Sequence, residues 1–209
     1  MCGCPFALNA PDSVWSIYLI VGRSLYKTPA IFQFKEEPKM RIVNARLRLD
    51  DEGVPRVVKS PAKLYPEIQY FGNAQDIVKV MTDVFEIHKE TQEVLYLIAL
   101  NLKSKPLAFF EIGRGNIQET IVDARGIMIR LMMCNASSFI LVHNHPSGDC
   151  TPSKPDMIVA ERMKQLSDLM GVYFLENLII GADKSCFSFF INVWDKENNN
   201  DKNKNHVEA

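Results

Sequence analysis

Residues 138–156 read SFILVHNHPSGDCTPSKPD, and this stretch decides the architecture expected for the chain. Its first five residues form an apolar run rich in β-branched and aromatic types, which predicts a buried strand. His143 and His145 follow at the end of that strand. Because side chains alternate along a strand, both imidazoles point to the same side and can bind one ion.

A turn and a helix follow the two histidines. Residues 146–149 (PSGD) are turn-forming and end the strand. From Ser153 onward apolar residues recur at helical spacing, and Gly171 is typical of a helix end. Asp156 therefore lies in the first turn of this helix, close to the end of the strand. The residues expected on its buried face are Val159, Met163, Leu166 and Met170.

Two neutral imidazoles and one carboxylate suit Zn²⁺ and leave a fourth position for water, as in catalytic zinc sites. A structural interpretation exists as well, because Ser153 and Asp156 also have the spacing of a helix capping box. A lone H-x-H on a strand is likewise more often incidental. Two of only four histidines nevertheless fall together beside a turn and a first-turn carboxylate, which favours the metal site. The four are His88, His143, His145 and His206.

This motif resembles the signature of a known family. H-x-H-P followed by S-x-x-D is similar to the JAMM motif of JAB/MPN metallopeptidases, and the longer run HNHPSGD-x-TPS-x-x-D resembles their RadC-like branch. The likeness extends over about residues 73–190. It implies one zinc ion bound by His143, His145 and Asp156. It also implies that Ser153 assists at the oxyanion or the water, and that an upstream glutamate is the acid/base.

The resemblance also implies a fold and an activity. The fold is a single α/β domain of the JAB/MPN type, related to cytidine deaminases, in which helices pack against a mixed β-sheet. The activity is hydrolysis of an amide or isopeptide bond in a peptide or protein by metal-activated water. Deaminase chemistry is not expected, because the H-x-E and P-C-x-x-C elements are missing. The alternatives are a RadC-like accessory factor in DNA repair or mobile-element biology, and a non-catalytic MPN scaffold.

Glu111 is the glutamate that the sequence favours as acid/base. It closes a strand beside Phe109, Phe110 and Ile112, just before the glycine-rich run at residues 113–116. Partial desolvation there would raise its proton affinity toward the range useful for a general base. The local sequence matches the family's E-x-x-x-G-T context except for asparagine in place of threonine, and Glu119 is the second candidate. Without the downstream motif, Glu111 would be interpreted as a solvent-facing residue at a strand end.

The remaining elements flank this motif, and four segments are expected. Residues 1–39 form an irregular N-terminal extension that we suspect is not native, with Met40 as the natural start. Residues 40–72 contain a strand over 40–49 and a proline- and charge-rich connector over 50–66. Residues 73–194 form the RadC-like domain, and residues 195–209 a disordered polar tail. The elements predicted within the domain are a helix capped by Asn73, strands over 93–102 and 106–112, a helix over 121–135, and strands over 172–180 and 186–191.

Composition limits the class of protein and its partners. The 24 Lys and Arg residues balance 25 Asp and Glu residues, so the chain lacks the strongly basic character typical of nucleic-acid binding. Five irregularly spaced cysteines indicate a reducing compartment. The early apolar run at residues 14–21 is too short to cross a bilayer and has no basic region before it. We therefore expect a cytoplasmic protein whose direct partner is a peptide or protein.

Two departures from the family pattern lie near the motif. Cys150 stands in the metal loop where relatives often have proline, so it is either a tolerated small residue or an oxidation-prone or competing ligand. Glu176-Asn177 replaces a common Asp-His pair, which puts in doubt any role of this pair in orienting the site.

Overall fold

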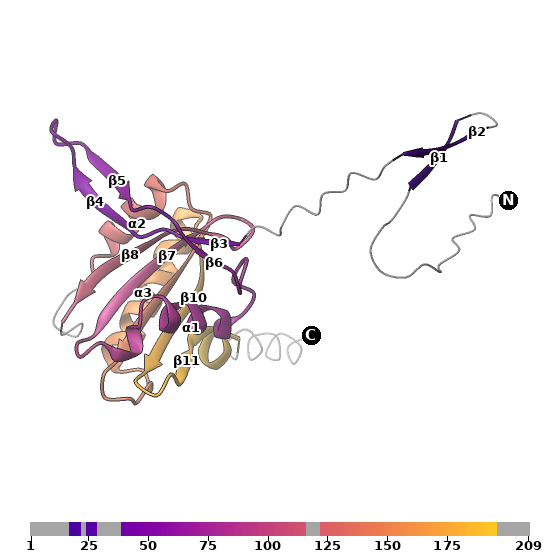
Figure 1. Ribbon diagram of the computed structural model, residues 1–209. Coiled ribbons are helices and arrows are strands. Elements are labelled where there is room, and N and C mark those ends of the chain that lie inside the picture. The colour runs from indigo at the N-terminus through magenta and orange to yellow at the C-terminus, as the bar shows by residue number, and fades with distance from the viewer. Residues whose placement is uncertain (1–16, 22–23, 29–38, 116–121, 196–209) are drawn as a thin grey trace, which may run out of the picture. The chain divides into compact units, whose positions relative to one another are not determined.

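The computed structural model describes residues 17–21, 24–28, 39–115 and 122–195 (Figure 1). The chain divides into two compact units, Met1–Glu37 and Pro38–Ala209. In the first unit, strand β1 (Ile17–Val21) pairs antiparallel with β2 (Ser24–Thr28). The expectation that residues 1–39 lack regular structure was therefore wrong. The run IYLIV in β1 consists of residue types that favour strands.

A five-stranded mixed sheet forms the centre of the second unit, as predicted. Its strands lie in the order β11-β10-β9-β7-β8, in which β9 and β10 are parallel and the other neighbours antiparallel. This order places β7 beside the strand that carries the two histidines, and β8 at the edge. The strands are β7 (Val94–Leu100), β8 (Pro106–Arg114), β9 (Ser138–His145), β10 (Tyr173–Gly181) and β11 (Cys186–Ser188).

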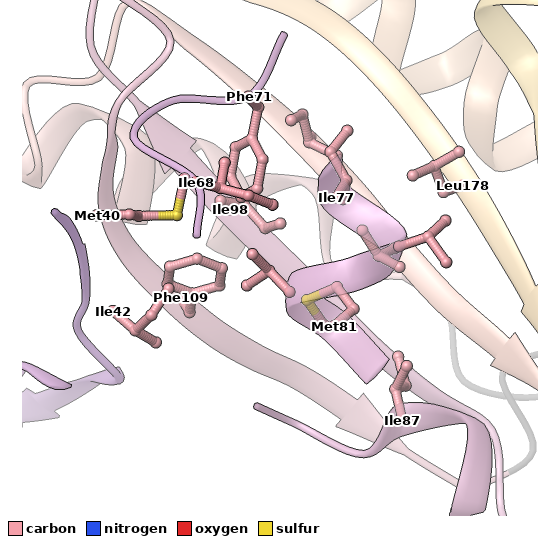
Figure 2. Close-up of a cluster of buried hydrophobic side chains, with 14 of the residues drawn as sticks. Met40, Ile42, Ile68, Phe71, Ile77, Met81, Ile87, Ile98, Phe109 and Leu178 are labelled. Carbon is pink, nitrogen blue, oxygen red and sulfur yellow. The ribbon is translucent and has the colours of Figure 1, made fainter. Parts of the chain in front are cut away.

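Helices cover both faces of this sheet (Figure 1). Helix α1 (Ala74–Asp83) packs on one face, and Figure 2 shows its buried side chains against those of β7, β8 and β10. Helices α2 (Ala124–Met133) and α3 (Lys154–Met170) pack on the other face. Residues of even number in β7 and β9 face α1, and residues of odd number face α2 and α3. The two faces are called the α1 face and the α2/α3 face below.

Helix α3 begins and ends where the sequence predicts, with Ser153 as N-cap and Gly171 as C-cap. Its buried stripe differs from the expected one, because Met170 is 46% exposed. The fully buried positions recur at spacings of four, three and four residues, which is one face of a helix. They are Asp156, Ala160, Met163 and Ser167. The inward side of the helix therefore carries Asp156 toward the sheet.

The segment before α1 contains more strands than expected. β3 (Met40–Ile42) pairs with β6 (Lys63–Tyr65), and β4 (Ala45–Leu49) pairs with β5 (Pro55–Lys59). The predicted single strand over residues 40–49 is interrupted at Asn44, which bridges to Phe109 on β8 instead. The predicted connector forms a hairpin because the Asp50 carboxylate accepts hydrogen bonds from two backbone N–H groups of the turn, those of Glu52 and Val54.

The last predicted strand is also shorter than expected. β11 ends at Ser188, and residues Phe190–Trp194 form a short helix, η2. The Glu176 carboxylate explains the change of direction, because it accepts hydrogen bonds from Ser188 Oγ (2.6 Å) and Phe190 N (3.1 Å). The tail predicted to be disordered lies outside the described residues from residue 196 onward. Among the helices that the structure describes, none has the length and apolar character needed to cross a bilayer.

Candidate metal centre

The two motif histidines lie on the α2/α3 face at the end of β9. His143 pairs with Leu95 of β7, and the core residues Phe139 and Leu141 precede it on the same face. His143 is 4% exposed and His145 is half-buried. Their Nε2 atoms lie 3.2 Å apart, so the two imidazoles converge as the strand alternation predicts.

Helix α3 contributes a carboxylate to the same point. Asp156 Oδ1 lies 3.3 Å from His143 Nε2, and Asp156 Oδ2 lies 3.5 Å from His145 Nε2. Ser153 holds this carboxylate, since its Oγ (2.6 Å) and its backbone N–H (2.7 Å) both donate hydrogen bonds to Oδ2. The capping box and the ligand cluster considered as alternatives from the sequence are therefore both present.

The three side chains fit a metal ion such as zinc. One ligand atom from each of His143, His145 and Asp156 lies within 4.8 Å of the others. In a tetrahedral zinc site with bonds of about 2.0–2.1 Å, neighbouring ligand atoms are about 3.3 Å apart, close to the separations seen here. His145 Nδ1 lies 2.7 Å from the Asp149 carbonyl oxygen and donates to it, which leaves the lone pair of Nε2 for a metal.

Electrostatics within the cluster favour a charged aspartate. Burial of Asp156 opposes ionisation, but hydrogen bonds from His143, His145 and Ser153 hold the pKa of this carboxyl well below its usual range. The pKa of His145 is raised, chiefly by its hydrogen bond with Asp156. Because a metal binds the neutral imidazole, protons and a metal ion compete for His145.

The loop after β9 approaches the end of β10 closely. Gly181 pairs with His145, and a Cβ at Gly181 would lie 2.5 Å from the carbonyl oxygen of Gly148. Gly148 itself has a φ of 86°, a conformation that favours glycine. These two glycines let the loop fold back so that the Asp149 carbonyl reaches His145.

Glu111 does not join this cluster. It pairs with Tyr96, which in turn pairs with Val142, so all three side chains lie on the α1 face. Its carboxylate is exposed, forms an ion pair with Arg114 (3.1 Å) and accepts a hydrogen bond from Tyr96 Oη (3.4 Å). The predicted convergence and desolvation of Glu111 are therefore wrong. The second candidate, Glu119, lies outside the described residues.

Glu93, which the sequence did not single out, lies on the same face of the sheet as the two histidines. It precedes β7 and is two residues before Leu95, the partner of His143, so alternation points its half-buried side chain to the α2/α3 face. Gly115 N donates to the Glu93 carbonyl (2.9 Å), which extends the β7–β8 ladder to this residue. Asp156 is the main cause of the raised pKa of His145, and the charge of Glu93 acts in the same direction. Glu93 thus lies on the same side of the sheet as His143, His145 and Asp156.

Cys150 and the Glu176-Asn177 pair, the two departures from the family pattern, contact residues other than His143, His145 and Asp156. Cys150 Sγ lies 3.5 Å from Ser185 Oγ and is not part of the ligand group. The buried Glu176 carboxylate accepts hydrogen bonds from β10 and from the segment after β11, including one from Asn177 N (2.9 Å). Glu176 therefore stabilises the connection between β11 and η2 and does not contribute to the group of His143, His145 and Asp156.

Comparison with known proteins agrees with this arrangement. The family model described as the RadC-like JAB domain matches residues 71–196. The chain belongs to this family. The family and the α/β fold predicted from the motif are therefore confirmed.

Several relatives of this RadC-like JAB domain protein carry the name UPF0758 protein. One from Clostridium perfringens is 37% identical over 122 residues, which cover 58% of this chain and 51% of the relative. One from Porphyromonas gingivalis is 38% identical over 98 residues, covering 47% and 43%. One from Clostridium botulinum is 31% identical over 139 residues, covering 63% and 61%. The chain thus spans about half the length of the curated relatives it matches.

Proposed function

We propose that this RadC-like JAB domain is a zinc-dependent hydrolase that cleaves an amide or isopeptide bond in a peptide or protein. One observation carries the proposal. The Nε2 atoms of His143 and His145 and the Asp156 carboxylate lie at the mutual separations of a tetrahedral site, and among the residues that the structure describes they form a group of three ligands. A site with three protein ligands keeps a fourth position for water or substrate.

The ligand residues and their neighbours have distinct tasks. When bound, zinc supplies Lewis acidity and lowers the pKa of a coordinated water to ~7. The chain holds the ion through His143, His145 and Asp156, and the Asp149 carbonyl fixes the His145 tautomer. The low pKa of Asp156 keeps a negative charge available for the metal throughout the physiological pH range.

Glu93 is the group that moves the proton in this proposal. Its side chain lies on the same face as the ligands, and its half-buried position leaves it accessible to water. A carboxylate there accepts a proton from the attacking water and returns it to the leaving amine, as general acid–base catalysis of amide hydrolysis requires. Glu111 cannot take this role, because its side chain lies on the opposite face of the sheet.

Ser153 has one role that its contacts support and one that the family resemblance implies. Its hydroxyl donates to Asp156 Oδ2, so it orients a metal ligand. To stabilise a developing oxyanion, the Ser153 hydroxyl would have to donate its hydrogen to the oxyanion and give up its hydrogen bond to Asp156. We propose that orientation of Asp156 is its main role.

The convergence of His143, His145 and Asp156 favours this function over a non-catalytic scaffold, because such a scaffold does not need three metal-ligating side chains at one point. For a DNA-related role, the net charge of −1 provides no electrostatic support.

Metal analysis combined with a hydrolysis assay tests the proposal. The purified full chain and a His88→Ala control should each contain one zinc ion, and His145→Ala should contain none. Cleavage of an isopeptide-linked protein substrate by the wild type should stop with a chelator and return with added zinc. A wild-type protein that takes up no zinc, or zinc-loaded protein that leaves a panel of peptide and isopeptide bonds intact, would contradict the proposal.

A further inference from the structure

Asn144 lies between the two metal-binding histidines and points the other way. It follows Val142 along the α1 face, where it is 1% exposed. A side-chain amide buried this completely needs hydrogen-bond partners, because an unsatisfied donor or acceptor away from water is strongly destabilising.

The partners of Asn144 all come from one short segment, the residues that lead into β7. Asn144 Oδ1 accepts a hydrogen bond from Val94 N (2.8 Å). Asn144 Nδ2 donates to the carbonyl oxygens of Gln92 (3.1 Å) and Glu90 (3.5 Å). Asparagine combines an acceptor and two donors in one short side chain, which is the combination that this segment requires.

These bonds flank Glu93 on both sides in the sequence. Gln92 and Val94 are its neighbours, so one side chain fixes the backbone immediately before and after it. Gly115 N donates to the carbonyl of Glu93 itself from the side of β8. Hydrogen bonds from β9 and β8 thus fix the backbone of Glu93 as it enters β7, and its side chain points to the α2/α3 face.

We propose that Asn144 is a positioning residue that fixes Glu93 against the cluster of His143, His145 and Asp156. Consecutive residues of β9 then serve both parts of the site, since the histidines hold the metal and the asparagine between them orients the proton-transfer group. This inference rests on the proposed function, because it assigns Asn144 a task in that reaction.

A matched control lies at the other end of β7. Asn101 Oδ1 accepts hydrogen bonds from the backbone N–H groups of Lys103 (2.9 Å) and Lys105 (3.1 Å). It therefore stabilises a connection of the same sheet by the same chemistry, far along β7 from Glu93. Asn101 is less buried and makes two such bonds rather than three, so Asn101→Ala should destabilise the fold less than Asn144→Ala. It shows what freeing the other end of β7 does, and a change in the spectrum of a bound metal ion should appear only in Asn144→Ala.

The test compares five full-length proteins: wild type, Asn144→Ala, Asn144→Asp, Asn101→Ala and Glu93→Gln. Asn144→Asp keeps the acceptor for Val94 N–H and loses both donors, so it serves if Asn144→Ala fails to fold. The first measurement is amide hydrogen exchange in metal-free protein. Val94 should exchange at least about 10-fold faster in Asn144→Ala than in wild type or Asn101→Ala, because its acceptor is gone.

The second measurement is the visible spectrum of the Co²⁺-loaded proteins, with Zn²⁺ affinity measured in parallel. The Zn²⁺ dissociation constants of the Asn144 variants should stay within about 10-fold of wild type, because the ligands are retained. Their Co²⁺ spectra should shift in the same direction as that of Glu93→Gln, and the spectrum of Asn101→Ala should match wild type.

Two results overturn the role of Asn144. One is exchange at Val94 in Asn144→Ala that is as slow as in wild type. The other is Co²⁺ spectra of both Asn144 variants that are identical to wild type while that of Glu93→Gln is shifted. A failure of the proposed function looks different, because the wild type itself then binds neither Co²⁺ nor Zn²⁺, or binds zinc and cleaves no substrate. The exchange measurement needs no metal, so the two failures are told apart.

Discussion

The two faces of the sheet differ sharply at the end of β9, although consecutive residues build them. On the α2/α3 face, His143 and His145 meet Asp156, and strand alternation points Glu93 to the same face. On the α1 face, Asn144 is enclosed and fully occupied with backbone partners. Position within the strand period, rather than nearness in the sequence, therefore decides which residues can take part in chemistry.

The same difference separates the two glutamates considered for proton transfer. Glu93 lies beside β7 on the face of the ligands, whereas Glu111 lies on the other face with Tyr96 and Arg114. Both belong to strands next to one another in the sheet. Substitutions at the His143–His145–Asp156 cluster and at matched positions away from it should therefore have very different effects.

The largest effect should come from the two glutamates. Glu93→Gln should lower the hydrolysis rate by about 10²–10⁴-fold, the usual contribution of general acid–base catalysis, with zinc still bound. Glu111→Gln should retain a rate near that of wild type, because its side chain faces away from the metal. Steady-state rates and metal content of both variants provide the measurement. Equal losses in the two variants would remove the distinction between the faces.

Gly181→Ala should have the next largest effect. The added Cβ would meet the Gly148 carbonyl at 2.5 Å and displace the loop that holds His145. We expect zinc affinity to fall by roughly 10–100-fold, the range for lost support of a metal ligand. Gly113→Ala on β8 is the control, because its Cβ would meet no atom within 4 Å. Competition with a chelator measures both affinities, and an unchanged value for Gly181→Ala would contradict the expected role of the close approach.

The two capping boxes offer a smaller and more selective comparison. Ser153 caps α3 on the metal face, and Asn73 caps α1 on the other. Changing either residue to alanine should lower the free energy of unfolding of the metal-free protein by about 1 kcal/mol. Only Ser153→Ala should also weaken zinc binding, by roughly 10-fold, because it frees Asp156. Denaturant unfolding and metal titration of both variants separate the two effects, and weaker zinc binding in Asn73→Ala would argue against this selectivity.

The smallest effect concerns pH and the metal-free protein. The pKa of His145 is raised above its ordinary value of 6.5, so its contribution to stability is complete below that pH and is lost as the pH rises through the raised pKa. The pKa of Asp156 is lowered from its ordinary value of 3.8, so the contribution of Asp156 to stability is complete above that pH and is lost only in stronger acid. Between pH 6 and 8 the melting temperature of wild type should therefore decline more than that of His145→Gln. Melting temperatures of both proteins, measured with a chelator present across this pH range, test the prediction. Equal declines in the two proteins would contradict it.

Sequence features predicted the part of the site that is local in the chain. His143, His145, Ser153 and Asp156 lie on one strand, one turn and one helix start, and alternation and capping rules are enough to bring them together. The helix capped by Asn73 was predicted for the same reason, since its cap and apolar stripe lie within a dozen residues.

The residues that sequence reasoning missed depend on which strands are neighbours. Glu93 was placed correctly at the start of a strand, but the role proposed for it requires β7 to lie beside β9 in one particular register. The choice of Glu111 assumed that a carboxylate at the end of a strand faces the histidines, and it has the parity of Phe109 beneath α1 instead. The short strands β5 and β6 were missed because their pairing partners, rather than their own residues, make them strands.

The Asp156 side chain both caps the start of helix α3 and faces the two histidines, so one carboxylate serves the helix and the candidate metal site. A relative without a metal site would still lose helix stability if Asp156 or Ser153 were replaced. Natural selection for folding alone is thus sufficient to preserve both residues. An aspartate retained in a relative is therefore weaker evidence for a metal site than a retained pair of histidines, because the helix does not need the histidines.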